Sequence, residues 1–172
     1  LDQFFTKANE ALVSLIHELN TLPTSSDLTS ISSFDSRELA AVFLSGGITI
    51  LSANDLDGSL DKSILMNQLK KQTSENSIFA GAFDLEEAMV LASVLVAPQN
   101  VLSNMPANEL EGFLTEVKSL TGGATHYNGI YAADRHGPRL FIIVGGLPLP
   151  TRTSELLTEA TEEAARFSTK KE

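Results

Sequence analysis

The sequence predicts an α+β domain with a small, mostly antiparallel sheet and flanking helices. Three observations lead to this class. Apolar residues recur at helical spacing in residues 2–20 and again after Pro106. Two β-type runs, 125–133 and 139–144, flank a polar turn. The order of elements is helix-rich, with only a few short strands.

Six helices are expected from apolar spacing, capping residues and the glycine pairs that end them. The segment Leu85 to Val96 is apolar almost all round, so it is expected to be the buried helix. Asp84 and Glu87 form a pair like a capping box at its start. The expected helices cover residues 2–20, 35–44, 59–69, 85–96, 107–121 and 153–167.

The clearest β signal is a hairpin of strands 125–133 and 139–144, joined by a loop of four or five residues. Shorter strands are expected at 48–53 and 78–82. The run from Leu140 to Val144 is apolar on both faces, which is typical of a central strand covered on both sides. Helix 85–96 and the helix after Pro106 would cover one side, and the last helix the other. Phe141 and Ile143 are therefore expected in the core or at a subunit contact.

Length and composition predict one domain spanning residues 1–172, with a loop at 21–36, where nine of sixteen residues are Ser or Thr. The 22 acidic residues outnumber the 12 basic ones, giving a net charge of −10. Nucleic-acid binding and docking on an anionic membrane are therefore not expected. The longest apolar run, Ala88 to Ala97, is about half of what a bilayer requires, so no membrane insertion is expected.

The chain contains no cysteine, which excludes disulfides, thiolate metal sites and cysteine nucleophiles. No signal peptide is visible, but the chain starts at Leu1 rather than Met. Removal of a leader before this residue therefore stays open. The expected compartment is either the cytoplasm or, after such a removal, an organelle or secretory lumen.

Two histidines lie on or beside the predicted hairpin, together with other side chains suited to binding. A histidine next to a carboxylate could serve acid–base chemistry near neutral pH. The segment 134–137 also has the composition of an ordinary hairpin loop, so no catalytic residue is assigned. The candidate binding residues are His126, Tyr127, Asp134, Arg135 and His136.

No metal or phosphate site is expected. Asp55, Asp57, Gly58 and Asp61 resemble part of a calcium loop, but the aligned positions 1 and 12 are an alanine and an isoleucine. A turn followed by a helix cap explains these residues. The glycine pairs at 46–47 and 145–146 lack the strand–GxGxxG–helix context of a phosphate-binding loop.

Residues 106–168 resemble the GlcG/HbpS-like haem-binding family. The matching features are the strand and turn at 130–137, the strand at 140–144, the loop at 147–150 and the Ala-containing helix at 156–167. Val144-Gly145-Gly146 replaces the Met-Asp-Gly usual in that family, so no pocket residues are transferred. The resemblance implies a profilin-like layer arrangement and a role in binding haem or a related tetrapyrrole.

These observations lead to one functional hypothesis and two alternatives. Because no complete catalytic or cofactor motif is present, the leading prediction is a non-enzymatic binding domain, a protein-interaction or assembly subunit with a protein partner or self-association. The first alternative is a haem-binding module. The second is an enzyme that uses His126, Asp134 or His136 for acid–base chemistry.

Overall fold

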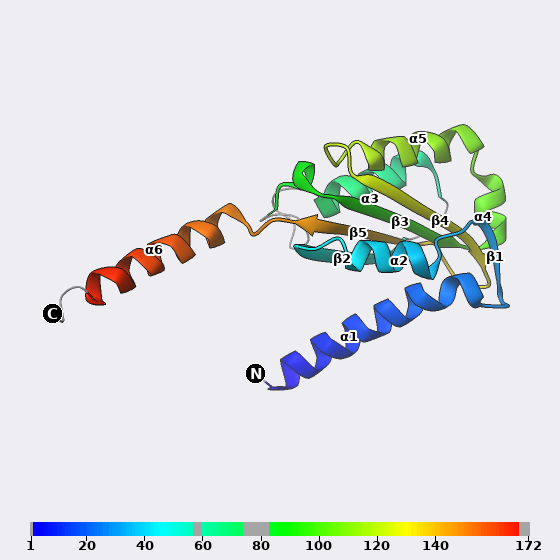
Figure 1. The fold of residues 1–172 in the computed structure, drawn as a ribbon. Coiled ribbons are helices and arrows are strands. Elements are labelled where there is room, and N and C mark those ends of the chain that lie inside the picture. The colour runs from blue at the N-terminus through cyan, green and yellow to red at the C-terminus, as the bar shows by residue number, and fades with distance from the viewer. Residues whose placement is uncertain (1, 57–59, 74–82, 169–172) are drawn as a thin grey trace.

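The computed structural model describes residues 2–56, 60–73 and 83–168, which form a five-stranded sheet with helices on both faces (Figure 1). The elements follow the chain in the order α1 (Asp2–Thr21), η1 (Leu22–Thr24), β1 (Leu28–Ser32), α2 (Ser36–Phe43), β2 (Ile48–Asp55), α3 (Lys62–Thr73), η2 (Leu85–Glu87), β3 (Val90–Ala97), α4 (Gln99–Asn104), α5 (Ala107–Lys118), β4 (Thr125–Ala133), β5 (Arg139–Leu147) and α6 (Thr151–Ser168).

The sheet has the strand order β1-β4-β3-β5-β2, with β3 at its centre. Strand β3 runs parallel to β4 and antiparallel to β5. The two edge strands, β1 and β2, pair antiparallel with β4 and β5. The α+β class is therefore confirmed, and the sheet is mixed because of its single parallel pair.

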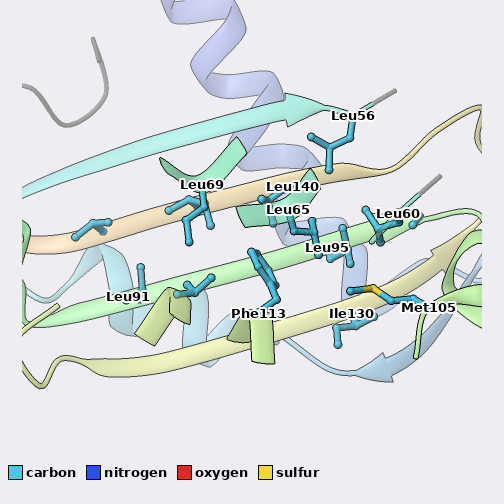
Figure 2. Close-up of a cluster of buried hydrophobic side chains, with 14 of the residues drawn as sticks. Leu56, Leu60, Leu65, Leu69, Leu91, Leu95, Met105, Phe113, Ile130 and Leu140 are labelled. Carbon is cyan, nitrogen blue, oxygen red and sulfur yellow. The ribbon is translucent and has the colours of Figure 1, made fainter. Parts of the chain in front are cut away.

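Side-chain alternation along the central strands divides the core into two clusters. In β3, Leu91 and Leu95 face α3, α4 and α5, whereas Val94 and Val96 face α1 and α2. Figure 2 shows the first cluster, in which Phe113 of α5 and Leu65 of α3 lie against the sheet. A fully buried Leu or Phe contributes about 1.5–3 kcal/mol, so these two layers hold the helices in place.

Most helices follow the sequence prediction. Helices α1, α2, α3, α5 and α6 lie close to the expected ranges. Asp35 begins α2 with a full capping box. Its carboxylate accepts from the backbone N–H groups of Arg37 and Glu38, and the Glu38 side chain accepts from the backbone N–H of Asp35. The strand expected at 78–82 lies outside the described residues.

The helix expected at 85–96 is wrong: Val90–Ala97 forms β3, and all eight of its residues are buried. A strand covered on both faces is apolar on both faces, which is also how a buried helix reads. Three valines within these eight residues favour the strand, since β-branched side chains suit a pleated surface. Asp84 caps only the short turn η2, where its carboxylate accepts from the N–H of Glu86.

The predicted hairpin is also wrong in its pairing. Strands β4 and β5 follow each other in sequence, yet β3 lies between them and each pairs with β3. The segment 134–138 therefore crosses the end of β3 rather than making a tight turn. Its Pro138 carbonyl accepts a hydrogen bond of 2.8 Å from the N–H of Leu56, which ties the crossing to the end of β2.

Two further expectations need correction. The last helix does not cover the sheet, because α6 extends away from it and the faces are covered by the other helices (Figure 1). The Ser/Thr-rich stretch 21–36 is not simply a loop, since it contains η1 and the edge strand β1. Strand β1 is held partly through the hydroxyl of Ser32, which donates to the Asn128 carbonyl.

Candidate functional site

The five candidate binding residues do not converge at one place. His126 and Tyr127 are near the start of β4, and successive strand residues point to opposite faces. Asp134, Arg135 and His136 follow the end of the same strand. At about 3.3 Å per residue, His126 and Asp134 are roughly 26 Å apart. The structure thus divides the candidates between the two ends of the sheet.

His126 is half-buried and makes one specific contact. Its Nε2 lies 2.9 Å from the Oγ of Ser93, a buried residue on the central strand β3. Burial lowers the pKa of His126 below its ordinary value of about 6.5, and the positive charge of Lys118 lowers it further. His126 thus gives the buried hydroxyl of Ser93 a hydrogen-bond partner on the otherwise apolar strand β3.

This lowered pKa predicts that the domain loses stability as the pH falls from about 7.5 to 5.5. The unfolded chain takes up a proton near pH 6.5, whereas folded His126 resists protonation until a lower pH. The free energy of unfolding therefore has its full value above pH 6.5, and it falls as the pH drops toward the pKa of folded His126. Urea unfolding at several pH values measures it.

A His126→Gln variant provides the control, because glutamine does not titrate. Its free energy of unfolding should vary less between pH 7.5 and 5.5 than that of the wild type. Equal pH dependence in the two proteins would show that His126 does not cause the effect.

At the other end of the sheet, Arg135 belongs to an ion-pair network. Its Nη2 donates to Asp55 Oδ1 at 2.8 Å, and Arg139 Nη1 lies 3.1 Å from Asp55 Oδ2. Arg139 also reaches Glu18 on α1, with Nη2 to Oε2 at 3.4 Å. These contacts join α1, β2 and the 134–138 crossing, so Arg135 has a structural role here. Asp134 and His136 are exposed beside it.

Phe141 and Ile143 are both fully buried, in the cluster covered by α1 and α2. Among the described residues no group of three or more His, Asp or Glu is placed to hold a metal ion. Asp55 of the calcium-like segment pairs with the two arginines, and Asp61 caps α3 through the N–H of Ile64. Hydrogen bonds from Ser63 and Ile64 hold the pKa of Asp61 below its ordinary value.

The surface that the sequence analysis missed is α6. Every side chain from 152 to 163 is exposed, although Leu156, Leu157 and Ala160 fall on one side of the helix. Leu156 is 48% exposed and Leu157 is 55% exposed. The sequence revealed the stripe, but it could not show that the core was already complete without it. An amphipathic helix that leaves its apolar side in water is typical of an interaction surface.

A second apolar surface lies where α1 and α2 run side by side. Together they border a groove of about 460 Å³ whose wall is mainly apolar. Val13 on α1 is 66% exposed, and Phe43 at the end of α2 is 37% exposed.

Among the described helices, none is long and apolar enough to cross a membrane.

Solved structures that superpose on this chain include protofilaments of other proteins. No protein-family model matches the chain, and no curated protein matches it at a significant level. Among solved structures, a GTPγS-form protofilament of TubZ from Bacillus thuringiensis serovar israelensis superposes with a TM-score of 0.69 at 19% identity, over 94% of this chain and 41% of that one.

Two further solved structures superpose with lower TM-scores. The FtsZ dimer of M. jannaschii has a TM-score of 0.58 at 18% identity, covering 88% of this chain and 44% of FtsZ. CetZ2 from Haloferax volcanii, as a GTPγS-bound protofilament, has a TM-score of 0.57 at 17% identity, covering 80% of this chain and 40% of CetZ2. The chain thus spans about two-fifths of the length of each protein.

These matches overturn the resemblance to the GlcG/HbpS-like haem-binding family, and with it the profilin-like arrangement and haem binding. They also overturn the prediction of a non-enzymatic binding domain and its two alternatives, because the matched structures include TubZ protofilaments in GTPγS and GDP forms. What this chain shares with them is a mixed five-stranded sheet flanked by helices, and its fold is that of about two-fifths of a TubZ-, FtsZ- or CetZ-like protein.

Proposed function

We propose that the chain is part of a filament-forming, GTP-binding protein and supplies contacts between its copies. The likeness to a TubZ protofilament over 94% of the chain is the observation that carries this proposal. Four further matches are TubZ structures, and two of these are helical models of filaments. Filaments require contacts between different surfaces of successive copies, so this domain should carry such surfaces exposed.

GTP binding is proposed for the protein as a whole, because the match covers only 41% of TubZ. The glycine pairs of this chain have structural tasks instead of forming a phosphate loop. Gly47 has a φ of +59°, and a Cβ there would collide with the carbonyl oxygen of Leu147. A Cβ on Gly145 would come within 2.7 Å of the Val42 carbonyl oxygen at the end of α2. Gly47 thus lets the start of β2 approach β5, and Gly145 lets the end of α2 approach β5.

Helix α6 is the proposed contact surface. It follows the segment Leu147-Pro148-Leu149-Pro150, in which two prolines restrict the backbone and favour an extended connection. This connection supports a helix held away from its own core, as in Figure 1. Its leucines then remain available to a neighbouring copy.

Replacing both Leu156 and Leu157 with Asp should abolish self-association while leaving the domain folded. Neither leucine contributes to the two core clusters. Burying two leucines contributes about 3 kcal/mol or more to a contact, and 1.4 kcal/mol is a tenfold change in affinity. We therefore expect association to weaken at least about a hundredfold, measured by sedimentation velocity over a range of concentrations.

Thr158→Asp is the matched control, because residue 158 points away from the stripe and receives the same charge. This variant should associate like the wild type. If the double leucine variant also did so, the role of α6 would be refuted.

The GTP component predicts that polymer formation depends on the nucleotide. Ultracentrifugation of the whole GTP-binding protein in the presence of GTP should pellet more protein than in the presence of GDP. Equal amounts in the two pellets would contradict it, without bearing on the role of α6.

A further inference from the structure

We draw no further inference here: the strongest candidate, the pocket that Asp27, Asn100 and Asp134 border at the carboxyl ends of β3 and β4, rests on two exposed carboxylates, and nothing among the described residues shows what it would hold.

Discussion

Replacing Phe141 with Asp is expected to unfold the domain, at a cost of about 3 kcal/mol or more. Phe141 is fully buried on β5, where it packs in the cluster beneath α1 and α2. A carboxylate there would lose its hydration within an apolar layer. The guanidinium of Arg139 lies 5.3 Å from the ring centroid, but that group is already paired with Asp55 and Glu18.

Urea denaturation of Phe141→Asp and Phe141→Leu measures this effect. The leucine variant retains an apolar side chain and should lose only about 1–2 kcal/mol. A loss below about 1 kcal/mol for the aspartate variant would contradict the position of Phe141 in the core. Ile143→Asp should behave like Phe141→Asp, because Ile143 is buried in the same cluster.

Replacing Tyr131 with Phe is expected to cost about 2–6 kcal/mol, although only one oxygen atom is removed. The Tyr131 hydroxyl accepts a hydrogen bond from the N–H of Phe34 at 2.7 Å and donates one to the Phe34 carbonyl at 2.9 Å. Both contacts are buried. Without the hydroxyl, two backbone groups remain unpaired, each at a cost of about 1–3 kcal/mol.

Tyr127→Phe is the matched control, because Tyr127 lies on the same strand and packs against the same cluster but is only half-buried. It should lose less than about 1 kcal/mol. Equal losses for the two variants would exclude a special role for Tyr131.

Local signals in the sequence predicted most helices. The first helix and the helix after Pro106 each have one apolar side and one polar side, and both are found close to the expected ranges. Segment 90–97 was misassigned because a strand buried on both faces has no alternation to distinguish it from a buried helix. The valines in it were the available evidence for a strand.

Pairing between strands depended on information outside the local sequence. Strands β4 and β5 look like a hairpin because five turn-type residues join them. Strand β3 occupies the position between them, and it comes from a segment about 30 residues earlier that was assigned to a helix. One misassigned strand therefore changed the topology of the whole sheet.

The structure does not bring the five candidate binding residues together, and the reason is related. Asp134 and His136 were grouped with His126 as candidate binding residues, but β4 holds the two groups at opposite ends. The last helix was expected to cover one side of the sheet, yet its apolar side is exposed. Only the complete arrangement of the sheet shows that both faces are covered by other helices.

Copies of this chain are proposed to associate end to end through α6. Electron microscopy of the purified chain at increasing concentration tests it most directly. We expect linear strands of repeating subunits for the wild type and for Thr158→Asp, and single particles for the variant with Asp at both 156 and 157. Single, unassociated particles of the wild type at every concentration would contradict it.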